Sequence, residues 1–116
     1  MDLSPNRERV TALLKSIVTR LLSGDYESLE SAQYEQVNSA EELQYGIEEY
    51  PGRLTMPPDW AFYEWDAIPV TVSNGPEWAL VFDLWYDDEV SDNILEMSVF
   101  EVDGQLEFTI DNIHVM

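Results

Sequence analysis

The 116-residue sequence contains no cysteine, one histidine and only five Lys or Arg residues. The absence of cysteine excludes disulfides, thiolate nucleophiles and thiolate zinc sites. The shortage of cations argues against binding to nucleic-acid backbones or anionic membranes, since both depend on clustered positive charge. No apolar run is long enough to span a membrane, and the N-terminal MDLSPNRERV lacks the apolar core of a signal peptide. We therefore expect a cytoplasmic protein without direct nucleic-acid or membrane contacts.

Acidic residues are what the chain has in excess. There are 24 of them, which gives a net charge of −19, yet the 45% hydrophobic and 12% aromatic content is typical of a folded protein. The length fits a single domain over residues 1–116. The first 23 residues hold four Lys or Arg against two acids, whereas the rest hold one cation, Arg53, against 22 acids. Charge of this size steers positive partners toward a protein.

Helical periodicity fills the first half of the chain. Ser4-Pro5 predicts a helix start, with Ser as the N-cap, and apolar residues then recur at the spacing of one helix face up to Ser23-Gly24. Ser39 opens an S-x-x-E capping box, which predicts another helix start. We expect helices over residues 5–22, 25–32 and 39–50, followed by a connecting loop over residues 53–61 that includes one helical turn.

From about Trp65 the apolar period changes from 3.6 to 2, which indicates strands. Pro69 favours an edge position for the first of them. The N-G-P sequence at 74–76 predicts a turn, and the D-G sequence at 103–104 predicts a type I′ hairpin. The expected strands cover residues 65–72, 77–86, 94–102 and 105–113.

The two-residue turn at 103–104 sets the register of the last hairpin, and the alternation of apolar and polar residues agrees with it. We expect Val102 opposite Gln105, Val99 opposite Phe108, Met97 opposite Ile110, Phe100 opposite Glu107, Ser98 opposite Thr109 and Glu96 opposite Asp111. Helices followed by a meander of strands are typical of the α+β class. The expected fold has three N-terminal helices (about residues 5–50) packed on one face of a curved, roughly four-stranded antiparallel sheet (about residues 63–115).

The stretch DLWYDDEVSD at residues 83–92 places five carboxylates beside a Trp and a Tyr. One interpretation is a calcium loop, but the EF-hand spacing and its glycine are missing. A second is an ordinary solvated hairpin loop at 87–93. A third is a face for a positively charged partner. The second interpretation does not account for Asp83 and Trp85, which belong to a strand.

Asp83 and Trp85 should share the sheet face opposite the helices with Val81 and Phe100. Aromatic anchors ringed by charge of one sign are typical of protein-binding surfaces. A homodimer interface, or cover by the N-terminal segment, is the alternative explanation. The candidate partner-binding residues are Asp83, Trp85, Tyr86, Asp87, Asp88, Glu89, Asp92 and Phe100.

Catalysis has little support in the sequence. The sole histidine, His114, lies next to Asp111 and Asn112, which would allow a carboxylate–His pair, but no glycine-framed Ser nucleophile is present. Paired carboxylates carry no information in a chain this acidic. We assign no catalytic residue, no metal ligand and no cofactor, and we do not expect an enzyme.

Several motifs resemble a family of small acidic bacterial domains: GDYESLE, SAEELQYGIEEY, VFDLW and the closing IDNIHV. The resemblance covers nearly the whole chain but includes no known active site. It implies the helix-then-sheet cone architecture of cystatin-like and nuclear-transport-factor-like proteins. It also implies the role of an immunity protein, which neutralises a cognate toxin, as in contact-dependent growth inhibition. Enzymes with the cone fold usually place acid–base residues inside the cone, where this chain has apolar residues.

Charge and resemblance together predict an inhibitor of a basic bacterial toxin. We expect the toxin to be a nuclease, because nuclease clefts are rich in Lys and Arg. Blockade would be steric and electrostatic, and the protein would act as a monomer or homodimer. One alternative is a small-molecule-binding or catalytic cone domain with a polar cavity lined by Tyr26, Tyr45, Tyr50 and His114. Another is a homodimeric adaptor that uses Val81, Trp85 and Phe100.

Overall fold

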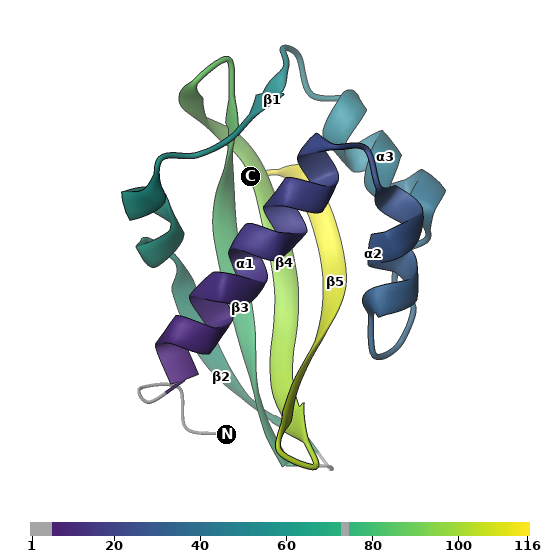
Figure 1. Cartoon of the computed structure of the whole chain (residues 1–116), viewed down its shortest axis with the longest axis vertical. Helices are drawn as coiled ribbons and strands as arrows, with labels where there is room; N and C mark the ends of the chain where they lie inside the picture. The colour runs from purple at the N-terminus through teal and green to yellow at the C-terminus, as the bar shows by residue number, and fades with distance from the viewer. Residues whose placement is uncertain (1–5, 73–74) are drawn as a thin grey trace.

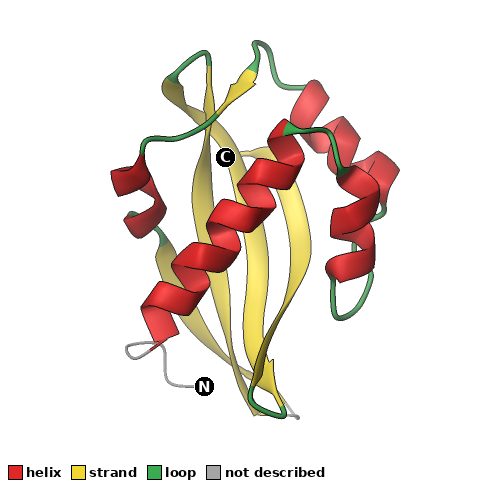
Figure 2. Cartoon of the chain, in the orientation of Figure 1, coloured by secondary structure: helices red, strands yellow, loops and turns green. Residues whose placement is uncertain are grey.

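The computed structural model describes residues 6–72 and 75–116 and confirms the α+β class. Three helices precede a curved antiparallel sheet and cover one of its faces (Figures 1 and 2). The helices are α1 (Arg7–Leu22), α2 (Tyr26–Ala32), α3 (Ala40–Glu48) and a short 3-10 helix, η2 (Asp59–Tyr63). The strands are β1 (Leu54–Thr55), β2 (Asp66–Val72), β3 (Gly75–Tyr86), β4 (Glu89–Val102) and β5 (Gln105–Val115). The expected helix start at Ser4-Pro5 and Asn74 of the expected turn lie outside the described residues.

The apolar stripe of α1 forms the helix side of the core. Leu14, Ile17 and Leu21 are buried against side chains of the sheet, among them Phe82 and Leu95. Figure 1 shows α1 crossing the sheet diagonally, while α2 and α3 lie toward β5. None of the described helices combines the length and apolar character needed to cross a membrane.

The capping box of α3 is present as expected. The Ser39 hydroxyl accepts from the backbone N–H of Glu42, and the Glu42 carboxylate accepts from the backbone N–H of Ser39. These bonds satisfy backbone donors that a helix start leaves without partners. The helix therefore begins where the local sequence indicates.

The sheet order is β1-β3-β4-β5, and β2 also pairs with β3. The predicted register of the last hairpin is confirmed from Val102 opposite Gln105 to Met97 opposite Ile110. The next predicted pair is wrong, because Glu96 lies opposite Asn112. Asp111 is an extra residue in a β-bulge, which leaves two successive residues exposed and returns Ile113 to the core.

The predicted hairpin loop over residues 87–93 is also wrong. β3 and β4 are joined by a two-residue turn in which Asp87 and Asp88 have φ angles of 53° and 62°. Positive φ at both positions matches the twist of the flanking strands, and Asp tolerates this region better than most residues. Glu89 is already paired with Tyr86. The pairing of β3 with β4 is irregular further along β4, where residues 91–93 form a bulge opposite Leu84.

The two edges of the sheet differ. The edge of β5 is covered by the segment after α2: Tyr34 donates its backbone N–H to Phe108 O at 2.9 Å, and Asn38 Nδ2 donates to Ile110 O at 2.8 Å. At the opposite edge, β2 pairs with β3 up to Val81 and β1 pairs only with residues 85–86. Between them, no described strand pairs with residues 82–84 at this edge. Covered edges resist association with other chains, so contact with a partner is expected on this side of the sheet rather than at β5.

Candidate functional site

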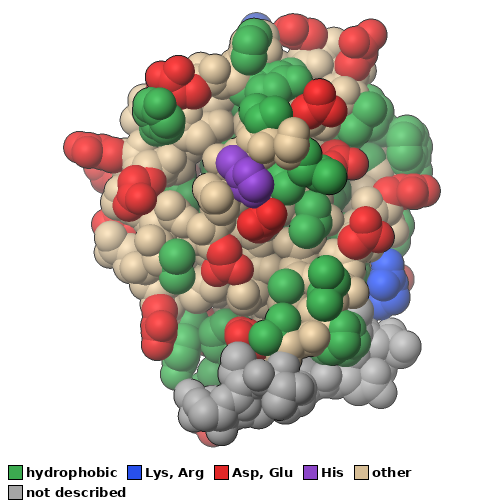
Figure 3. Space-filling view, turned by 180° about the vertical axis from the view of Figure 1, so that it is seen from behind, with side chains coloured by type: hydrophobic (Ala, Val, Ile, Leu, Met, Phe, Trp, Pro, Cys, Tyr) green, Lys and Arg blue, Asp and Glu red, His purple; other side chains and the backbone are tan. Residues whose placement is uncertain are grey.

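The sheet face opposite α1 is open and acidic. Figure 3 shows this face, on which Asp and Glu side chains alternate with hydrophobic ones while Lys and Arg appear only at the rim. The sequence contains no Lys or Arg from Asp66 to Met116. Opposite charge near a protein surface is attracted over distances of about 8 Å at physiological ionic strength. This face therefore attracts cations and repels anions.

The predicted alternation along β3 is confirmed. Leu80, Phe82 and Leu84 are buried in the core, whereas Asp83 is exposed and Trp85 is half-buried on the open face. The two faces of β3 therefore serve different purposes: one builds the core, and the other presents an acid and an aromatic ring to solvent.

The predicted grouping of Trp85 with Phe100 is wrong in its geometry. Trp85 lies opposite Val90, and Phe100 is ten residues further along β4. At about 3.3 Å per residue this places the two rings on the order of 30 Å apart. Phe100 instead makes an edge contact with Tyr34, at 5.3 Å between ring centroids. The open face thus holds two separate aromatic positions rather than one patch.

The acidic turn has a structural role in addition to its charge. Asp87 Oδ1 accepts from the backbone N–H of Arg53 at 3.1 Å, and the Asp87 N–H donates to Arg53 O at 2.8 Å. The Asp88 N–H donates to Thr55 Oγ1 at 2.9 Å. The turn therefore holds β1 against the hairpin. Glu89 and Asp92 are exposed and make no such contact through their carboxylates in the part of the chain that the structure describes.

Tyr86 is not a surface residue, although we predicted it to be in the partner-binding set. It is 5% exposed, and its hydroxyl donates to Ile47 O at 2.7 Å. Asn93, buried on β4, donates from Nδ2 to Gly46 O at 3.0 Å and to the Tyr86 hydroxyl at 3.1 Å. Two sheet side chains thus satisfy carbonyls in the last turn of α3, which a helix leaves without partners.

Burial raises the pKa of Tyr86. The Asn93 hydrogen bond opposes this in part, and the neighbouring Tyr26 and Tyr50 add lesser effects that raise the pKa. The folded state therefore holds this proton more tightly than the unfolded state. Stability from this group is fully present below about pH 10 and is lost as the pH rises through the folded-state pKa.

We expect urea denaturation to show this alkaline loss of stability, and we expect the Tyr86→Phe substitution to reduce it. The pKa of Tyr26 is also raised by burial, so some dependence of the free energy of unfolding on pH should remain in this variant. An unchanged pH dependence would contradict the assignment to Tyr86.

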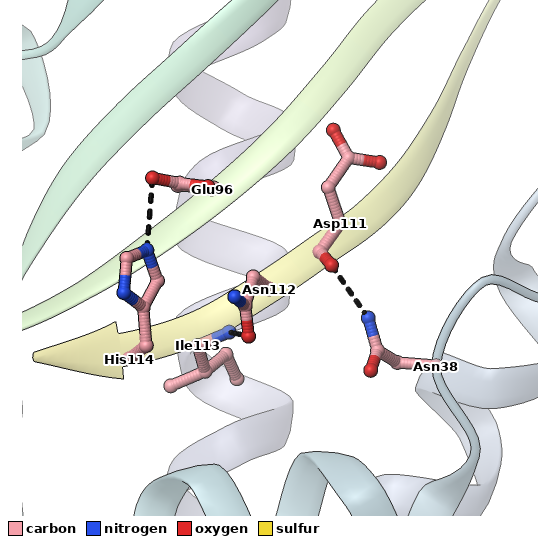
Figure 4. Close-up of polar contacts among 6 residues, drawn as sticks. All are labelled: Asn38, Glu96, Asp111, Asn112, Ile113 and His114. Atoms are coloured by element: carbon pink, nitrogen blue, oxygen red, sulfur yellow. Dashed lines mark hydrogen bonds and ion pairs between the residues drawn. The ribbon is translucent and has the colours of Figure 1, made fainter.

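His114 forms its carboxylate pair with a different residue from the expected one. Its Nε2 lies 2.9 Å from Glu96 Oε1 on the neighbouring strand (Figure 4). The Asp111 carboxylate instead accepts from Ser98 Oγ and Thr109 Oγ1. Because the Ser98 hydroxyl is directed to Asp111, it does not form a nucleophile–base pair with His114.

The four residues expected to line a cavity do not converge. Tyr45 and His114 line an open cleft of about 560 Å³ between α3 and the end of β5. Tyr50 packs against Tyr86, with ring centroids 4.5 Å apart, and Tyr26 is half-buried against the core. Among the described residues, no group of three or more His, Asp or Glu side chains is arranged to hold a metal ion.

The aromatic groove is the feature that sequence reasoning missed. It has a volume of about 500 Å³ and lies between η2 and β3. Trp60 and Tyr63 on η2 are 61% and 51% exposed, and Trp60 makes an edge contact with Trp85 at 5.8 Å between centroids. The remaining lining residues are Ala61, Glu64, Trp65, Asp66, Phe82, Asp83 and Val90. The dense aromatics of DWAFYEW were the available signal. A helical turn was expected in this loop, but the sequence did not indicate that η2 packs beside β3.

Comparison with known proteins gives one family and no named relative. No curated protein and no solved structure matches the chain. A family profile matches residues 18–116, which span the end of α1, the other helices and the whole sheet. The groove and the open sheet face both lie within the matched region. The chain therefore belongs to the family described as Domain of unknown function (DUF7668).

Proposed function

We propose that the protein binds and neutralises a basic protein partner through the open acidic face. The observation that carries this proposal is the aromatic groove: exposed Trp60, Tyr63 and half-buried Trp85 lie beside the acids Asp66 and Asp83, next to a sheet whose strands from β2 onward contain no Lys or Arg. Large exposed aromatics cost solubility, and a ring of like charge around them is typical of protein-binding surfaces.

The biological role in this proposal is immunity to a bacterial toxin of the nuclease class, exercised in the cytoplasm. A nuclease cleft is lined with cations because it binds phosphate, and a protein of charge −19 is steered toward such a cleft. Occupation of the cleft excludes the nucleic acid by steric overlap and by charge. The inhibitor needs no cofactor and no chemistry of its own.

The two parts of the surface contribute to different rate constants. Exposed acids act at long range and raise the association rate, whereas desolvated aromatic rings slow dissociation. A homodimer that buries the open face on itself is the competing arrangement. Sedimentation velocity at two concentrations separates them, because a dimer would dissociate on dilution and would hide the groove.

The test is affinity capture from lysate of the source strain, followed by binding kinetics with the purified partner. Between about 50 and 500 mM salt the screening length falls severalfold, so we expect the association rate to fall by about tenfold or more. Asp83→Asn should slow association, while Glu27→Gln on the exposed side of α2 removes the same charge away from the face and serves as the control. An affinity indifferent to salt would contradict the proposal.

A further inference from the structure

We infer that the aromatic groove is the binding site for a single arginine side chain of the basic partner. This deepens the proposed function and rests on it. The groove lies where residues 82–84 of β3 have no paired strand at the β1/β2 edge, and η2 forms its opposite wall. Three residues of free edge are too few for a partner strand to add to the sheet. The groove therefore suits a side chain rather than an extended peptide.

The aromatic walls suit a planar cation. Trp60 and Trp85 meet at 78° between ring planes, so one ring presents its edge to the face of the other and the pair forms a corner. The electron-rich face of an indole attracts a guanidinium within about 6 Å of its centroid. Tyr63 extends the same wall along η2.

The chain uses the same contact at the rings next to the two indoles. Arg7 lies over the Trp65 ring at 4.0 Å, and Lys15 Nζ lies 5.7 Å from the Phe62 ring and 6.0 Å from the Tyr63 ring. Trp60 and Trp85 take part in none of the cation–π contacts found among the described residues. Their exposed ring surface is therefore left for a cation that the chain does not supply.

The acids of the groove favour arginine over lysine. Glu64, Asp66 and Asp83 are all exposed and line the same groove as the two indoles. A guanidinium stacks on an aromatic ring and donates bidentate hydrogen bonds to a carboxylate at the same time, whereas an ammonium is a more strongly hydrated point charge. The groove therefore offers both an aromatic ring for stacking and a carboxylate for bidentate hydrogen bonds.

The test uses acetyl-Gly-Arg-Gly-amide as the probe, in about 150 mM NaCl to suppress non-specific attraction. Two-dimensional NMR of the full chain follows the indole N–H signals, with Trp78, which packs against the core and does not line the groove, as the internal reference. We expect saturable shifts at Trp60 and Trp85, weaker binding of the lysine peptide, and no shifts with the neutral citrulline peptide. Equal shifts from citrulline, or shifts spread evenly over the acidic surface, would overturn the inference.

Variants supply a second, independent readout. Trp60→Ala and Asp83→Asn should each lower the affinity for the arginine peptide by about tenfold. A desolvated cation–π or charge-assisted contact contributes a factor of this size. The control is Asp103→Asn, which removes the same charge at the distant hairpin turn, where Asn tolerates the φ of 51°. A loss shared by all three variants would contradict the groove, because it would reflect total charge alone.

The two proposals fail in different ways. A basic partner that binds the full chain but is unaffected by Trp60→Ala and Asp83→Asn would overturn the arginine site and leave the proposed function standing. An arginine peptide held in the groove, with salt-independent binding of the partner elsewhere, would support the arginine site and overturn the proposed function.

Discussion

Replacing Asn93 by Ala is expected to lower the free energy of unfolding by about 3 kcal/mol, since the substitution removes donors from Gly46 O and from the Tyr86 hydroxyl in a buried setting. Asn93 is 1% exposed, so water does not readily replace the lost amide. The loss should also loosen the last turn of α3, whose carbonyls depend on the sheet for their partners. Urea denaturation measures the first effect, and amide exchange along α3 measures the second.

The matched control is Gln105→Ala, which removes an exposed amide on the neighbouring strand. Its expected cost is within about 0.5 kcal/mol, as for most surface substitutions. If the two variants were equally stable, the network of Asn93 and Tyr86 would not be what holds α3 to the sheet.

Gly46→Ala is expected to destabilise the fold by about 2 kcal/mol, against the usual direction of such a change. Ala at an interior helix position normally gains about 1 kcal/mol over Gly. Here a Cβ at Gly46 would lie 2.8 Å from Ile113 Cβ and 3.1 Å from Ile113 O. Neither atom is the end of a flexible side chain, so α3 itself has to move. Thermal and urea unfolding would both record the shift.

Gln44→Ala is the control within the same helix, because Gln44 is exposed and, among the described residues, its amide donates only to the Glu48 carboxylate. It should leave stability unchanged or slightly raised. A stabilised Gly46→Ala variant would mean that α3 is free to shift away from β5. The Gly46 and Asn93 substitutions should not be additive, since they affect the same contact.

Local signals determined most of the fold. The apolar stripe of α1, the capping box at Ser39 and the turn at 103–104 each act within a few residues, and each is confirmed. The errors arose where tertiary contacts decide. The turn at Asp87 lacks the Asn-Gly pattern of a type I′ hairpin and is supported by bonds to Arg53, more than thirty residues away in sequence.

The candidate site was predicted only in part, for a related reason. Strand alternation placed Asp83 and Trp85 on the open face, but it says nothing about distance along the sheet, so Phe100 was grouped with them. Tyr86 was grouped with the acids of the turn, although it continues the core-facing alternation of Leu80, Phe82 and Leu84. Trp60 joins the groove only because η2 packs beside an unpaired stretch of β3.

The distribution of charge between α1 and the sheet has a further consequence. The helix carries Arg7, Arg9, Lys15 and Arg20 against one acid, Glu8, while the strands from β2 onward carry acids alone. The molecule is therefore an electric dipole whose positive end is α1 and whose negative charge lies over the sheet and over α2 and α3. In the field of a cationic body such a dipole experiences a torque that turns the sheet forward before contact, so fewer encounters are wasted in the wrong orientation. Between two copies at low ionic strength, the same dipole favours head-to-tail alignment, with the helix of one toward the sheet of the next.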